Sequence, residues 1–128
     1  MSTEQTAGRK LVKAKRFEDL DVWNKAHKLV LRIYGVTRDF PGEEKFGLVS
    51  QMRRAAFSIP ANIAEGFKKR TVRDKSNFYN IAQGSLEELR YYIILAKDLD
   101  YLGNNRELLE SVDEVARMLY GLIKSIGR

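Results

Sequence analysis

Apolar residues recur at alternating spacings of three and four along most of the chain, which is the pattern of one face of an α-helix. The first series is Val22, Ala26, Leu29, Ile33, Val36 and Phe40. Similar series follow it to the C-terminal end. We therefore expect four helices: from about 20 to 40, from near 43 or 44 to 66, from about 72 to 102, and from after 104 or 105 to the end.

The expected helix ends carry recognisable signals. Pro41 and Gly42 are expected to end the first helix, because proline cannot continue it and glycine permits a turn. Thr71 followed by Asp74 resembles a capping box at the start of the third helix. Gly103 is expected to stop that helix. Heptad-like spacing with short connections predicts an all-α, antiparallel up-down-up-down four-helix bundle.

The second helix contains an anomaly. Pro60 lies where the helical pattern still runs, and a proline inside a helix costs about 3 kcal/mol because it removes a backbone donor and clashes with the preceding turn. We expect a kink there. Ser58 or Asn62 could bond the freed backbone groups and hold the bend, and Gly66 is expected to close the helix as a C-terminal cap.

Two arginines stand beside two alanines in the same helix, so charge lies next to a surface suited to close packing. Arginine is favoured in desolvated ion pairs and in phosphate binding. For Arg53 and Arg54 we expect structural ion pairing, with Glu65, Glu87 or Glu88 as partners, within one chain or across subunits.

Small and aromatic residues point to further contacts. Gly84 and Ser85 would let a neighbouring helix approach the third helix closely. Several helices also carry a second apolar stripe beside the first, with more aromatic surface than a bundle of this size easily covers, and exposed apolar patches mark interaction sites. We therefore expect oligomerisation. The aromatic residues concerned are Trp23, Phe57, Tyr79, Tyr91, Tyr92 and Tyr101.

The net charge of +6 is concentrated at the N-terminus. Residues 1–16 hold five basic residues against Glu4 alone, which gives +4. We expect a basic, flexible arm over 1–16 and the bundle domain over 17–128. Such an arm either binds phosphates or is a solvated terminus that aids solubility. Its basic residues are Arg9, Lys10, Lys13, Lys15 and Arg16.

A second basic cluster lies between the second and third expected helices. At a hairpin tip its side chains would converge on solvent and could contact a phosphate backbone, and the helix start at Thr71 offers unpaired amides to an anion. An ordinary solvated loop explains the same charges equally well. The cluster consists of Lys68, Lys69, Arg70 and Arg73.

Catalytic and metal-binding motifs are missing from the sequence. There is no cysteine, His27 is the only histidine, and neither a phosphate-binding loop nor a dinucleotide fingerprint occurs. Glu87 and Glu88 could join a carboxylate metal site, but the Glu-x-x-His pairs of di-iron bundles are absent. We expect no enzyme activity, no cofactor and no metal. With no long apolar run and no cysteine, we expect a cytoplasmic protein that does not span a membrane.

The chain resembles a known bacterial family, the 23S rRNA intervening-sequence protein family, also called the S23 ribosomal protein family. The resemblance is strong from residue 17 to about 102 and rests on pattern alone in the fourth helix. Its matching segments are Phe17-Glu18-Asp19-Leu20-x-Val22-Trp23, Phe40-Pro41-x-Glu43-Glu44-x-Phe46-Gly47-Leu48, Gln51-x-Arg53-Arg54-Ala55-Ala56-x-Ser58-Ile59, Ala61-Asn62-Ile63-Ala64-Glu65-Gly66 and Ile81-Ala82-x-Gly84-Ser85-Leu86-Glu87-Glu88-Leu89.

The resemblance implies a four-helix bundle that assembles into a homopentamer. Similar bundles serve as accessory variability proteins of diversity-generating retroelements, where a basic pentamer is thought to bind nucleic acid and a reverse transcriptase. Our leading hypothesis is therefore a non-enzymatic oligomer that binds RNA or DNA without base specificity. The alternative is a scaffold for a protein partner such as a reverse transcriptase.

Overall fold

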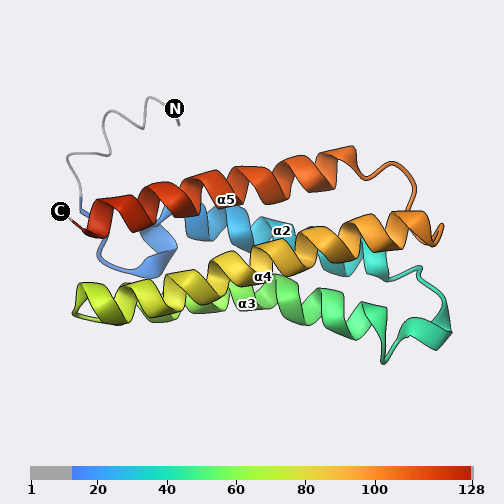
Figure 1. Ribbon diagram of the computed structural model, residues 1–128, viewed down its shortest axis with the longest axis horizontal. Helices are drawn as coiled ribbons and strands as arrows, with labels where there is room; N and C mark the ends of the chain where they lie inside the picture. The colour runs from blue at the N-terminus through green and yellow to red at the C-terminus, as the bar shows by residue number, and fades with distance from the viewer. Residues whose placement is uncertain (1–12, 128) are drawn as a thin grey trace.

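The computed structural model describes residues 13–127, and within this range every regular element is a helix (Figure 1). A short 3-10 turn, η1, precedes the first long helix, and a second, η2, lies between the first two. In chain order the elements are η1 Phe17–Asp19, α2 Asp21–Thr37, η2 Gly42–Glu44, α3 Leu48–Lys68, α4 Val72–Asp98 and α5 Arg106–Ile126.

The four long helices pack as a ring in which α2 contacts α3, α3 contacts α4, α4 contacts α5 and α5 contacts α2. The chain reverses direction at each connection, so the helices run up and down alternately (Figure 1). η1 and the α3–α4 connection lie at one end of the bundle. The predicted all-α four-helix fold is confirmed. Assembly into a pentamer stays a prediction, since one chain is described.

The core lies on the axis of this ring, where each helix contributes the apolar face that the sequence pattern predicts. Small residues are part of this core, among them Ala55 and Ala56 of α3 and Ala82 of α4, all fully or nearly fully buried. The largest fully buried side chains come from all four helices: Leu29, Ile33, Met52, Ile59, Ile63, Tyr79, Leu86, Leu89, Ile93, Val112, Val115 and Leu119.

The α2–α3 connection differs from the prediction at both ends. α2 ends at Thr37, so Phe40 lies beyond the helix, yet its side chain is buried because the chain turns back over the core there. α3 begins at Leu48 rather than near Glu43 or Glu44, because those residues form η2. The Glu44 side chain instead caps the start of α3, where Oε1 accepts a hydrogen bond from the Leu48 amide at 3.1 Å.

α3 continues without interruption through Pro60, so the proline does not end the helix, and a kink there stays a prediction. Two residues on either side of Pro60, Asn62 Nδ2 donates to the Ser58 carbonyl at 2.8 Å and to Ser58 Oγ at 3.0 Å. The carbonyl that loses its helical donor is the one four residues before the proline. Among the described contacts neither Ser58 nor Asn62 bonds that carbonyl, so the predicted bond to the freed backbone group is not found.

The expected role of Gly66 as a C-terminal cap is wrong. α3 runs two residues further, to Lys68, and no described glycine has a positive φ. Gly66 is buried against the ring of Tyr79 on α4, and a Cβ at this position would lie 2.6 Å from Tyr79 Cε1. The glycine is therefore required by the close approach of two helices and not by a turn.

The expected stop at Gly103 is also wrong, because α4 ends five residues before it, at Asp98. Asp100 takes the left-handed conformation with φ 64°. Its amide donates to the Lys97 carbonyl at 2.9 Å, and the Tyr101 amide donates to the Ala96 carbonyl at 2.9 Å. These two bonds form a Schellman motif, in which an aspartate fills the position that glycine usually occupies.

Candidate nucleic-acid interface

The α3–α4 hairpin presents the predicted basic cluster at one end of the bundle. Only residues 69–71 separate the two helices. Thr71 caps α4 as predicted, because its Oγ1 accepts a hydrogen bond from the Asp74 amide at 3.0 Å. Lys68, Arg70 and Arg73 are exposed, and no ion pair within residues 13–127 engages them. These three side chains are therefore available to a ligand.

Two lysines of the hairpin are already engaged in local contacts. Lys69 Nζ lies 3.7 Å from Glu65 Oε2 and 5.2 Å from the centre of the Phe78 ring. Lys75 Nζ donates to the Phe67 carbonyl at 2.8 Å and to the Gly66 carbonyl at 3.3 Å. The Lys75 ammonium group thus donates to carbonyls at the C-terminal end of α3 and interacts favourably with the negative end of the α3 dipole. Sequence reasoning missed Lys75, whose only signal is a lysine one turn into the next helix.

The end of the N-terminal arm is held against the bundle by a turn at η1. Asp19 Oδ2 accepts hydrogen bonds from the Lys15 amide at 2.9 Å and from the Arg16 amide at 3.3 Å. The Lys15 hydrogen bond is the main reason that the pKa of Asp19 is lowered. Hydrogen bonds to the charged form of a carboxylate favour that form. The turn places the last residues of the arm beside α3.

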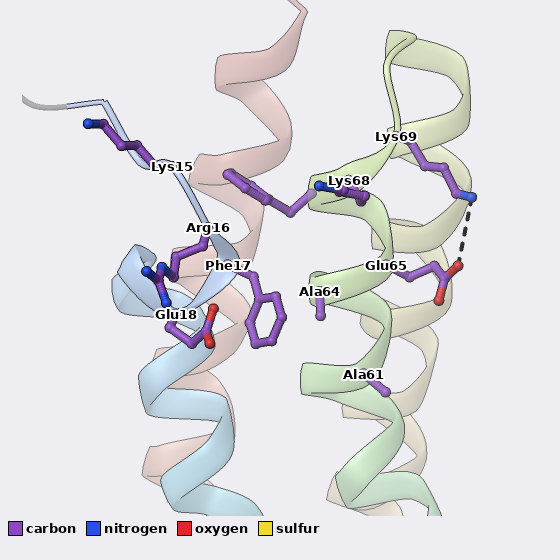
Figure 2. A pocket seen from close by; sticks show the side chains of 10 residues that line it. Lys15, Arg16, Phe17, Glu18, Ala61, Ala64, Glu65, Lys68 and Lys69 are labelled. Carbon is purple, nitrogen blue, oxygen red and sulfur yellow. Dashed lines mark ion pairs between the residues drawn. The ribbon is translucent and has the colours of Figure 1, made fainter.

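A pocket of about 420 Å³ opens between η1 and the C-terminal part of α3. Figure 2 shows the ring of Phe17 in the space between η1 and α3, on the side where Ala61 and Ala64 lie. The pocket is lined by Lys15, Arg16, Phe17, Glu18, Ala61, Ala64, Glu65, Phe67, Lys68 and Lys69. In Figure 2 the Lys68 side chain reaches toward the arm, whereas those of Lys15 and Arg16 extend along the arm away from α3.

The pocket joins two basic segments that are more than fifty residues apart in the sequence. Lys15 and Arg16 of the arm lie on one rim, and Lys68 and Lys69 of the hairpin lie on the other. Arg70, Arg73 and Lys13 are not among the lining residues, although all three are exposed. The predicted residues Arg9 and Lys10 lie outside the described residues.

The arginines of α3 do not form the expected ion pairs within the chain. Arg53 Nε donates to Thr37 Oγ1 at 2.9 Å, and its guanidinium lies 4.5 Å from the centre of the Tyr34 ring. Arg53 thus fastens α3 to α2, and Glu65 pairs with Lys69 instead. Within the described chain the predicted Arg–Glu pairing is therefore wrong, and pairing across subunits stays a prediction.

Arg54 is exposed and lies near a tyrosine–glutamate pair on α4. Tyr92 Oη donates to Glu88 Oε2 at 3.3 Å. Burial raises the pKa of Tyr92, the Glu88 carboxylate raises it further, and the Arg54 charge opposes both. The Glu88 carboxylate therefore bonds a tyrosine on its own helix and makes no ion pair with Arg54 among the contacts that the structure describes.

The two small residues of α4 behave differently. Ser85 is buried and its Oγ donates to Ser58 Oγ at 2.9 Å, so α3 does approach α4 closely at this point. Gly84 is exposed, and a Cβ built on it would have no neighbour within 4 Å. The expected close approach is therefore confirmed at Ser85 and does not occur at Gly84 within the chain.

Residues 13–127 also lack the features of two other kinds of function. Histidine and carboxylate side chains there do not gather in groups of three that could hold a metal ion. The helices in the same range are each too short or too polar to cross a membrane.

The chain matches one protein family over most of its length. The family model described as 23S rRNA-intervening sequence protein matches residues 18–121. A crystal structure from Bacteroides thetaiotaomicron VPI-5482, described as a protein with unknown function from the S23 ribosomal protein family, is 26% identical, with a TM-score of 0.73. That comparison covers 80% of this chain and 95% of the other chain. None of the curated proteins matches the chain.

Proposed function

The chain belongs to the 23S rRNA-intervening sequence protein family, and from this premise we propose that it is a non-enzymatic, oligomeric protein that binds RNA or DNA. Binding takes place at the basic end of the bundle, and the phosphate backbone supplies most of the affinity. The protein acts in the cytoplasm.

One observation carries the proposal, which is the meeting of two basic segments at one pocket. Lys15, Arg16, Lys68 and Lys69 all contribute to the lining of one pocket, and the exposed side chains of Arg70 and Arg73 lie on the same hairpin as Lys68 and Lys69. Cations spread over such a surface displace counterions from a polyanion, so affinity falls steeply as salt rises. Phosphate contacts carry no sequence information, so we expect little preference among sequences.

A fluorescence anisotropy titration tests this proposal. Labelled oligonucleotides are titrated with the protein at two salt concentrations, and the Lys68→Gln variant is compared with Lys97→Gln. Lys97 is an exposed lysine at the other end of α4. Loss of one phosphate contact lowers the slope of log K against log salt by about 0.9. We expect this reduction for Lys68→Gln alone. No binding of the wild type at low salt would refute the proposal.

Exposed apolar side chains support the oligomer. Four of the largest lie on three helices: Leu31 is 59% exposed, Phe57 46%, Ile81 50% and Tyr91 56%. Large exposed apolar surfaces mark association sites. A pentamer would carry five copies of the basic end, and their fields and contacts would add. Light scattering measures the subunit number, and a monomer at micromolar concentration would overturn this part of the proposal.

The same apolar surface favours a second candidate function, a scaffold that docks a partner protein such as a reverse transcriptase. A pull-down with and without nuclease separates the two candidates. A partner retained after complete nuclease digestion supports the scaffold. A partner released by nuclease supports binding through nucleic acid.

A further inference from the structure

We propose that the pocket between η1 and α3 holds one unpaired base of a single-stranded nucleic acid, while the cations on its rims hold the neighbouring phosphates. The inference rests on the proposed function and deepens it, because it names the form of nucleic acid that binds. It follows from the distribution of aromatic, apolar and charged groups in the pocket.

The interior of the pocket suits a flat, uncharged ring. Phe17, Phe67, Ala61 and Ala64 contribute its apolar lining, and the volume of about 420 Å³ falls within the usual range of small-molecule sites. Both phenylalanines are only partly buried, so part of each ring remains open to a ligand. The Phe17 ring is also held by a tilted contact with Trp23, whose ring centre lies 5.0 Å away. A supported aromatic ring beside a basic groove is the arrangement on which unpaired bases stack.

Charged side chains line the pocket beside its apolar surface. Figure 2 shows the exposed Glu18 carboxylate beside the Phe17 ring, whereas the Glu65 carboxylate pairs with Lys69. A phosphate placed at the Phe17 ring would meet the negative charge of Glu18. A base carries no charge and can enter, and the adjoining phosphates then lie outside the pocket, near exposed cations such as Lys68. The pattern therefore favours a base inside and phosphates outside.

Duplex nucleic acid does not fit this arrangement. Its bases are paired and stacked inside the helix, so one of them must be unstacked and flipped out before it can enter a pocket. The rims can still contact duplex phosphates. The expected behaviour is therefore binding to both forms, with a clear preference for the single strand.

The experiment compares anisotropy titrations of a single-stranded oligonucleotide and of its duplex, each as DNA and as RNA. Replacing a stacking ring reduces single-strand affinity by about 5- to 150-fold. We expect this loss for Phe17→Leu on single strands, with duplex affinity unchanged. Phe17→Tyr, which keeps the ring, should bind both forms like the wild type. The matched control is Phe46→Leu, at a phenylalanine that is 87% exposed in the α2–α3 connection.

Trp23 provides a second readout, because it is the only tryptophan and its ring contacts that of Phe17. A base that stacks on Phe17 should change its fluorescence, whereas a duplex held only at the rims should not. Circular dichroism of Phe17→Leu shows whether the variant is folded. If it is unfolded, the Trp23 response of the wild type to single strands and to duplex decides the question.

The outcomes separate the two proposals. Equal affinity of the wild type for single strand and duplex, with no effect of Phe17→Leu on either, would overturn the base pocket and leave the proposed function intact. Failure of the wild type to bind either form at low salt would overturn the proposed function itself.

Discussion

Replacing Gly66 by alanine should destabilise the protein, although alanine is the better helix former. The new Cβ would lie 2.6 Å from Tyr79 Cε1 and 3.2 Å from Phe78 Cβ. Carbon atoms in contact are normally about 3.5–4.0 Å apart, so the ring would have to retreat by about 1 Å. Tyr79 is 1% exposed and has no free space to enter.

Two opposing effects set the magnitude. Overpacking a close-packed core destabilises a protein by about 1–3 kcal/mol. The higher helix propensity of alanine stabilises it by about 1 kcal/mol. Because Tyr79 is enclosed and the Phe78 Cβ is fixed by the backbone, the cost lies at or above the upper end of that range. We expect a net loss of about 2 kcal/mol, which corresponds to a fall in Tm of about 5–10 °C.

The free energy of unfolding from urea titration measures the effect, with thermal melting as a check. Gly121→Ala is the matched control, since Gly121 lies inside α5 and a Cβ there would have no neighbour within 4 Å. It should stabilise the protein by about 1 kcal/mol. In a Tyr79→Leu background the cost of Gly66→Ala should shrink, because the clashing ring is gone.

The close-packing explanation has two clear points of failure. If Gly66→Ala is as stable as the wild type, the two helices are not in tight contact at this position. If its cost is the same in the Tyr79→Leu background, the clash with the Tyr79 ring is not the cause.

Three further predictions concern helix ends and the arm. Asp100→Gly should raise the free energy of unfolding in urea by about 0.5–1 kcal/mol, because glycine adopts a positive φ without strain, whereas Gly103→Ala should leave it nearly unchanged, since the helix does not end there. Thr71→Ala should cost about 1 kcal/mol in the same assay through loss of the hydrogen bond to the Asp74 amide, and equal stability would contradict the cap. Because the pKa of Asp19 is lowered in the folded protein, its carboxylate adds to the free energy of unfolding above its ordinary pKa of about 3.8. This contribution is lost as pH falls through the pKa of Asp19 in the folded protein. NMR titration of its carboxyl group should show the lowered value, and an ordinary value would contradict the turn.

The fold class and several local features follow from the amino-acid sequence alone. The three-and-four spacing of apolar residues predicts four helices and their core faces, because burial of one helix face is a periodic requirement. The Thr71 cap was predictable for the same kind of reason, since a cap involves residues only three positions apart.

Helix boundaries and the candidate site needed the tertiary structure. Within the sequence, Gly66 and Gly103 both look like helix stops. Only the packing shows that Gly66 admits the Tyr79 ring and that Asp100 supplies the left-handed turn. A glycine can either end a helix or allow two helices to approach closely. Which role Gly66 has depends on α4, which follows later in the chain.

The pocket is the clearest case of a feature that depends on tertiary packing and could not be predicted from the sequence. The sequence contains the arm and the hairpin as two separate basic clusters, and nothing in their spacing relates Lys15 to Lys68. The antiparallel ring of helices brings the start of α2 and the end of α3 to one end of the bundle, and the Asp19 turn folds the arm toward α3. The spacing of apolar residues predicts which face of each helix is buried. It does not predict which segments far apart in the sequence lie together, because that depends on how the helices pack.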